Sequence, residues 1–126
     1  MKPIRLILAA GTVLSLLVAV PASADHADTD YCSPSGDVCA STKMVDGVRK
    51  LRISTVEKYF SRYVLCVTAP DETRECKTFR IERQGQTYGD SVRWRARFPW
   101  EGRGDYYVRW RANGDNITPK LGFHIR

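Results

Sequence analysis

The stretch that decides the fold of this chain is residues 106–112, which read Tyr-Tyr-Val-Arg-Trp-Arg-Ala. From Tyr106 onward an apolar or aromatic side chain stands at every second position, and arginine stands at positions 109 and 111. A period of two is typical of a β-strand with one buried face and one solvent face. Residues 92–98 show the same alternation, with arginine at positions 93, 95 and 97. We therefore predict two strands whose tryptophans, Trp94 and Trp110, point into the core.

The same alternation begins at Val38 and continues through most of the chain. Asp46-Gly47 is a strong signal for a two-residue hairpin turn. Such a turn pairs residues whose numbers sum to 93, which places the apolar side chains before and after it on one face. No window has helical periodicity, and turn residues separate the short strands at close intervals. We predict an all-β fold, an antiparallel β-sandwich of about seven strands, with a small β-barrel as the alternative.

Cysteines provide a second constraint on this fold. The chain contains an even number of them, Cys32, Cys39, Cys66 and Cys76. A zinc site would favour a Cys-x-x-Cys pair, which the sequence lacks. We predict the disulfides Cys32–Cys39 and Cys66–Cys76, although the spacing alone leaves the other pairings open. If Cys66 lies opposite Cys76, that disulfide is on one face of its hairpin and Leu65 and Val67 are on the other.

Residues 104–108 carry a resemblance to a known family. Gly-Asp-Tyr-Tyr-Val resembles the beginning of strand F in immunoglobulin-like domains, where a tyrosine precedes an inward-facing cysteine by two residues. The chain is thus similar to a small secreted immunoglobulin-like β-sandwich. The resemblance implies that Tyr106 is the tyrosine-corner residue, with its hydroxyl hydrogen-bonded to nearby backbone. Val108 stands where that family has its cysteine.

The amino-terminal residues predict secretion. A short basic stretch, residues 1–5, precedes an uncharged run from Leu6 to Val20, and small residues follow at Ala22 and Ala24. This is the layout of a signal peptide, residues 1–24, and the uncharged run is shorter than the roughly 20 residues of a membrane span. We expect residues 25–37 to be a flexible acidic lead-in and residues 38–126 to be the sandwich domain. Loss of two basic residues with the leader lowers the formal net charge from +6 to +4.

No constellation of residues indicates catalysis. His26 and His124 are the two histidines, one in the lead-in and one near the end of the chain. The sequence has no nucleophile elbow, no zinc-binding helix motif and no phosphate-cradling glycine loop. We therefore predict a protein that is not an enzyme, with no catalytic residues, no metal ligands and no cofactor.

Arginine is the residue type that points to a function. If the two strands of residues 92–98 and 106–112 pair, one solvent face carries Arg93, Arg95, Arg97, Tyr107, Arg109 and Arg111. Like charges on neighbouring strands repel, and planar guanidinium groups match phosphates and carboxylates. We predict a binding module for an anionic extracellular partner, either a polyanion or an acidic protein. The alternative is a solvated surface, neutralised by interleaved acids such as Glu82 and Glu101.

A second function belongs to a different class. Small disulfide-linked secreted domains often inhibit enzymes by inserting a rigid loop into a target's active site. Residues 99–105 form the corresponding loop here, with Trp100 as an exposed aromatic anchor. Inhibition through this loop is therefore the alternative hypothesis.

Overall fold

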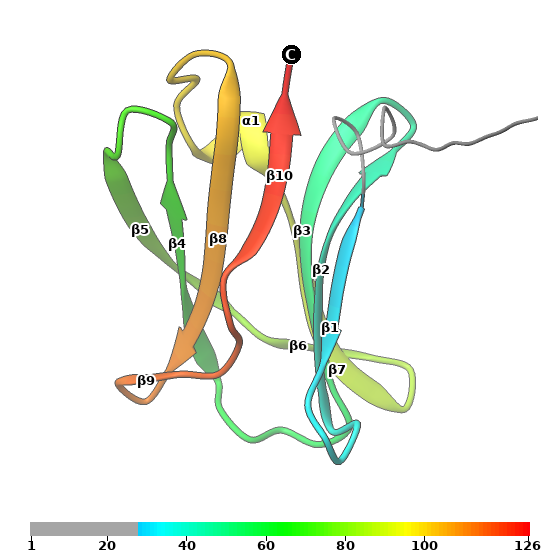
Figure 1. The fold of residues 1–126 in the computed structure, drawn as a ribbon. Helices are drawn as coiled ribbons and strands as arrows, with labels where there is room; N and C mark the ends of the chain where they lie inside the picture. The colour runs from blue at the N-terminus through cyan, green and yellow to red at the C-terminus, as the bar shows by residue number, and fades with distance from the viewer. Residues whose placement is uncertain (1–27) are drawn as a thin grey trace, which may run out of the picture.

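Residues 28–126 form two antiparallel sheets packed face to face in the computed structural model, as Figure 1 shows. The predicted signal peptide, residues 1–24, and the start of the lead-in lie outside the described residues. The two sheets are not closed into a barrel. The prediction of an antiparallel β-sandwich is therefore confirmed, and the barrel alternative is wrong.

Each sheet has five strands. Sheet A contains, in spatial order, β1 (Thr29–Cys32), β2 (Val38–Val45), β3 (Val48–Thr55), β7 (Thr87–Arg93) and β6 (Glu82–Gln84). Sheet B contains β10 (Leu121–Ile125), β8 (Gly104–Ala112), β4 (Arg62–Thr68) and β5 (Arg74–Arg80), with β9 (Asp115–Asn116) paired to β8. The connections β1–β2, β2–β3, β4–β5, β6–β7 and β8–β9 are hairpins within a sheet, and β10 returns to pair with β8. The connections β3–β4, β5–β6 and β7–β8 cross between the sheets.

The turn at Asp46-Gly47 has the predicted register. Val45 pairs with Val48 across it, so the numbers of paired residues sum to 93 along the whole hairpin. Both turn residues have positive φ, 51° at Asp46 and 77° at Gly47, as a tight primed hairpin turn requires. Consequently Ala40 and Leu51 lie on one face, and both are buried.

Both predicted disulfides are present, Cys32–Cys39 and Cys66–Cys76. Cys66 pairs directly with Cys76 in the β4–β5 register. The neighbouring residues Leu65 and Val67 are buried on the inner face of sheet B. The hairpin is therefore arranged as the sequence predicts, with the disulfide on the outer face.

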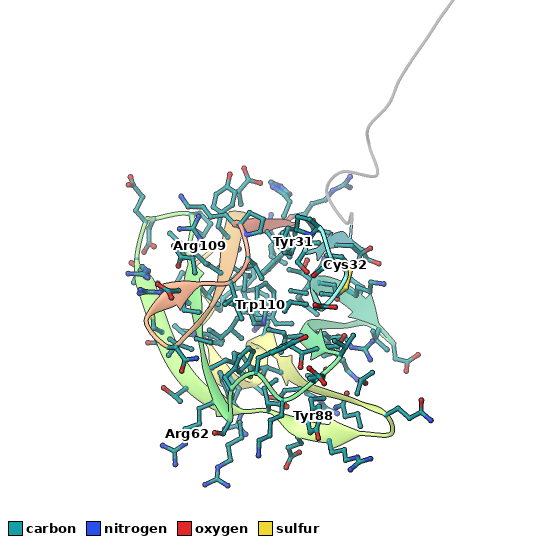
Figure 2. All side chains as sticks on the ribbon, turned by 90° about the horizontal axis from the view of Figure 1, so that it is seen from below. Tyr31, Cys32, Arg62, Tyr88, Arg109 and Trp110 are labelled. Carbon is teal, nitrogen blue, oxygen red and sulfur yellow. A yellow bond between two sulfur atoms is a disulfide. The ribbon has the colours of Figure 1, made fainter. Side chains whose placement is uncertain are left out.

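The core between the sheets is aromatic. Trp94 and Trp110 are both buried, as expected, and Figure 2 shows Trp110 in the interior. The ring of Trp94 makes edge contacts with Tyr106 and Phe123, at centroid separations of 4.8 and 5.0 Å. Tyr106 and Phe123 in turn stack in parallel at 5.3 Å. This cluster joins the end of sheet A to strands β8 and β10 of sheet B.

Residues 94–97 correct one of the predicted strands. They form a single helical turn, α1 (Trp94–Arg97), closed by a 2.8 Å hydrogen bond from the Phe98 N–H to the Trp94 carbonyl. Residues four apart lie on the same side of a helix as well as on the same face of a strand. Trp94 and Phe98 are therefore both buried in the helical turn, and only Ala96, which is exposed, breaks the alternation.

The expected lead-in, residues 25–37, also needs correction in its described part. Residues 29–32 form β1, which pairs with β2 through the whole of its length. Tyr31 packs against the core, and the Cys32–Cys39 disulfide links the strand to its neighbour. The Thr29 hydroxyl donates a 2.7 Å hydrogen bond to the Gly122 carbonyl of β10, which connects the edges of the two sheets. These contacts fix a segment whose acidic composition indicates disorder.

Candidate anion-binding face

The six residues predicted to form one basic face are distributed over three parts of the molecule. β7 belongs to sheet A and β8 to sheet B, so the two arginine-bearing segments do not pair. Arg93 ends β7 on the outer face of sheet A, and Arg95 and Arg97 are exposed on α1. Tyr107, Arg109 and Arg111 lie on the outer face of sheet B. The predicted continuous patch of five arginines is therefore wrong as a geometric unit.

A different set of five arginines shares the outer face of sheet B. On β8, the inward positions are buried and the alternate positions point outward, as Figure 2 illustrates for Trp110 and Arg109. The outward positions of β4 and β5 carry three more arginines. The resulting set, called here the sheet B arginine face, comprises Arg62, Arg74, Arg80, Arg109 and Arg111.

Sequence reasoning missed three of these residues, although the signal was available. Paired residues of β4 and β5 have numbers that sum to 142. Even positions in both strands therefore share the face of the Cys66–Cys76 disulfide, and Arg62, Arg74 and Arg80 all occupy even positions. The alternation around the tryptophans indicated outward arginines only in the carboxyl-terminal third of the chain.

One end of the face holds three arginines, two of which line a hollow. Arg62 lies directly opposite Arg80, and Arg111 follows opposite Val64 on the neighbouring strand. Arg62 and Arg111 both line a hollow of about 340 Å³, which Val64 and Thr78 also line. The Arg111 Nη2 donates a 2.9 Å hydrogen bond to the Gly114 carbonyl, which holds one side of this guanidinium against the β8–β9 turn. The hollow thus combines two cationic groups with a hydroxyl side chain, which suits an anionic group.

The other end of the face surrounds the disulfide. Arg109 pairs with Cys66 in the β4–β8 register. The Arg74 Nη2 lies 3.4 Å from the Cys66 Sγ, so its guanidinium covers part of the buried sulfur. Among residues 28–126, the buried Nε atoms of Arg109 and Arg111 have no hydrogen-bond partner. The row of paired residues that contains Arg74 lies six residues along the strands from the row that contains Arg62. At ~3.3 Å per residue, this separation is about 20 Å.

Acidic residues do not neutralise this face within the described part of the chain. None of its five arginines forms an ion pair with a carboxylate of residues 28–126. The outward carboxylate of β8, Asp105, is 2.6 Å from the His124 Nδ1. Glu82 lies on β6 of the other sheet, and Glu101 lies in the loop before β8. Glu82 and Glu101 therefore do not lie among the arginines of this face, where they would neutralise it.

Tyr107 occupies the margin of the face. Its ring is exposed and lies against Gly122, where an added Cβ would approach the ring to 3.3 Å. The Lys120 ammonium lies 5.9 Å from the ring centroid. Tyr107 thus covers β10 and carries a cation on its ring, but does not separate the arginines from solvent.

The loop of residues 99–105 is fixed at several points. The Tyr106 hydroxyl donates a 2.6 Å hydrogen bond to the Gly102 carbonyl and accepts one of 3.0 Å from the Glu101 N–H. The hydrogen bond expected of Tyr106 is therefore present. Trp100 is exposed, yet its ring contacts Trp94 at 6.3 Å and carries the Arg95 guanidinium at 4.9 Å.

Neither similarity to known proteins nor a recognisable metal site indicates a function for this chain. No family model, curated protein or solved structure matches the chain. Within residues 28–126, no group of three or more histidine, cysteine or acidic side chains is arranged to hold a metal ion. In the same range, the one helix is too short to cross a membrane. The geometry of the two outer faces and of the loop is therefore the evidence for function.

Proposed function

We propose that this protein is a secreted binding module that holds an anionic extracellular polymer on the sheet B arginine face. The observation that supports this most directly is the pairing of Arg62 with Arg80, two exposed cations at directly opposed positions. Like charges at such positions destabilise a sheet, by roughly 0.2–1 kcal/mol for a pair. An anion bound across them removes that repulsion, so binding and folding favour each other.

A polymer is a better match for the face than a single small anion. The arginines extend over about 20 Å of sheet, so they present several separate sites along one direction. A polymer with regularly spaced sulfate, phosphate or carboxylate groups contacts both ends of such a face at once. Guanidinium groups bind these oxygen acids with two parallel hydrogen bonds.

The test measures binding of fluorescent dextran sulfate, with neutral dextran as the probe that lacks charge. Binding of dextran sulfate should weaken steeply with salt, because each cation–anion contact releases about one counterion. The double variant Arg62→Gln/Arg111→Gln should make the slope of log affinity against log salt shallower by about 2. The matched control is Lys58→Gln/Arg103→Gln, which removes the same charge from exposed loop positions. If both double variants lost affinity for dextran sulfate equally, net charge alone would explain the binding and the proposal would be refuted.

Acidic proteins are a separate outcome of the same test. If an acidic protein binds through the face and dextran sulfate does not, the polymer assignment is wrong. Polygalacturonate carries carboxylates where dextran sulfate carries sulfates. Comparing the affinities for the two polymers identifies the acid group that the face prefers. The fold of each variant is checked by the buried-tryptophan fluorescence, which surface glutamines should leave unchanged.

Enzyme inhibition through residues 99–105 is the second candidate function. It is favoured by the hydrogen bonds of Tyr106 to Gly102 and Glu101, which hold the loop in one conformation beneath exposed Trp100. A preformed loop loses little conformational entropy when it enters a cleft. Binding of this kind should be lost in Trp100→Ala and should change little with salt, in contrast to polymer binding.

A further inference from the structure

The outer face of sheet A carries a second set of opposed cations. Lys43 on β2 pairs with Lys50 on β3, and Lys50 pairs in turn with Arg93 on β7. Three cations therefore occupy one row across three neighbouring strands. A row of this kind is unfavourable for the sheet by itself, for the same reason as the Arg62–Arg80 pair.

The next row on this face provides hydrogen-bond donors. Arg52 lies between two serines, because Ser41 is its partner on β2 and Ser91 its partner on β7. These three residues and Lys43 line one hollow of about 310 Å³, which the carboxylates Asp30 and Asp90 also line. A guanidinium flanked by hydroxyl groups offers several donors to the oxygens of an acid group.

Ion pairing on this face is limited to its edge. Lys43 lies 3.4 Å from Asp30 of β1, and the two side chains are 41% and 63% exposed. Lys50, Arg52 and Arg93 form no ion pair with a carboxylate in the described part of the chain. The interior strands of sheet A thus present cations that the protein itself leaves without a counter-charge.

The two basic faces point in opposite directions. Sheets A and B pack through their inner faces, so the outer face of each is directed away from the other (Figure 1). The buried aromatic core lies between them and prevents a short anionic chain from reaching both faces. Two separate chains are therefore required to occupy them together.

We propose that the protein cross-links anionic polymers, holding one segment on the sheet B arginine face and a second on the sheet A cations Lys43, Lys50, Arg52 and Arg93. This inference rests on the proposed function and adds a second site of the same ligand class. A cross-linker turns a solution of long polyanion into a network, and excess protein dissolves that network again because each segment then occupies its own protein molecule.

The first measurement is the number of short anionic chains that one protein molecule binds. The probe is a sulfated oligosaccharide too short to pass around the domain, titrated by calorimetry at low salt. We expect two oligosaccharides per protein. The sheet A variant Lys50→Gln/Arg52→Gln and the sheet B variant Arg62→Gln/Arg111→Gln should each bind one, while Lys58→Gln/Arg103→Gln should bind two.

The second measurement is light scattering with long dextran sulfate. The unmodified protein and the loop control should give scattering that rises and then falls as protein is added. Each single-face variant should bind the polymer without that rise. One oligosaccharide per unmodified protein, with the sheet B variant impaired, would overturn cross-linking and leave the proposed function intact. If the sheet B variant still bound two oligosaccharides with unchanged affinity, the proposed function would be overturned. If both single-face variants still gave the rise in scattering, cross-linking through these faces would be refuted.

Discussion

Arg62 on β4 lies directly opposite Arg80 on β5, and both side chains are exposed on the outer face of sheet B. β5 is the edge strand of its sheet, so the pair is accessible from the face and from the side. The repulsion between these groups acts on the free protein and falls when salt screens it. The same two residues therefore connect the stability of the sheet with the anion binding proposed for it.

Replacing Arg80 with threonine should stabilise the free protein and weaken its binding of dextran sulfate. The gain in the free energy of unfolding should be about 0.2–1 kcal/mol at low salt, since one of two opposed cations is removed. At about 1 M salt, where the Debye length is ~3 Å, the gain should largely disappear. Urea unfolding at both salt concentrations measures it, with Arg103→Thr in a loop as the control. A loss of stability at low salt would contradict the repulsion argument.

The Tyr106 hydroxyl should contribute measurably to stability. Tyr106→Phe removes the donor to the Gly102 carbonyl and the acceptor for the Glu101 N–H, which leaves two backbone groups without their partner. The expected cost is about 1–2 kcal/mol of unfolding free energy. Tyr107→Phe is the matched control, because within residues 28–126 that hydroxyl makes no hydrogen bond and the change should cost under about 0.5 kcal/mol. Equal effects in urea unfolding would show that the Tyr106 hydrogen bonds add nothing.

Alternation identified the inner and outer faces of most strands, because a half-buried strand has no other way to bury its apolar residues. It failed at residues 94–97, where a run of five alternating positions also contains the four-residue spacing of a helical turn. Trp94 and Phe98 satisfy both periods, and only the exposure of Ala96 distinguishes the helical turn from a strand. Short runs are ambiguous in this way whenever the middle residue is small.

The candidate site could be predicted in part. Alternation places Arg109 and Arg111 outward, and the β4–β5 register places Arg62 and Arg80 on the same side as the disulfide. What alternation cannot give is the identity of the neighbouring strand. The chain passes from β7 in sheet A to β8 in sheet B through α1, so Arg93 belongs to the opposite face. Crossovers of this kind depend on how the cores of two sheets fit together, which pairwise patterns do not encode.

Ala96 and Ala112 provide a direct test of the helical turn. Both occupy apolar positions of an alternating run, yet Ala96 is exposed on α1 and Ala112 is buried at the end of β8. Ala96→Gln should therefore change the unfolding free energy by less than about 0.5 kcal/mol. Ala112→Gln should cost about 1–3 kcal/mol, since a larger polar side chain enters a packed region. Comparable destabilisation by the two variants in urea unfolding would instead favour a continuous strand through residue 96.

The amino-terminal edge of sheet A should depend on Asp28 far more than on Asp30. Arg49 is buried on the inner face with its side chain 3% exposed, and its Nη1 lies 3.4 Å from the Asp28 carboxylate. Its guanidinium also lies 5.0 Å from the centroid of the Phe123 ring. Burial lowers the pKa of Arg49, and the charge of Asp28 together with its hydrogen bond acts in the opposite direction. The buried cation therefore depends on an acidic partner from the first described residue of the chain.

Removing that partner leaves the charge of Arg49 buried and uncompensated. Asp28→Asn should cost about 1–3 kcal/mol of unfolding free energy, less than for a fully buried pair because the Asp28 side chain is 44% exposed. Asp30→Asn breaks the exposed pair with Lys43 and should cost under about 1 kcal/mol. Arg49→Met removes the buried charge itself, so adding Asp28→Asn to that variant should have little further effect. Urea unfolding of the four proteins completes the cycle. Additive costs of the Asp28 and Arg49 substitutions would show that the two side chains act independently and that the carboxylate does not stabilise the buried guanidinium.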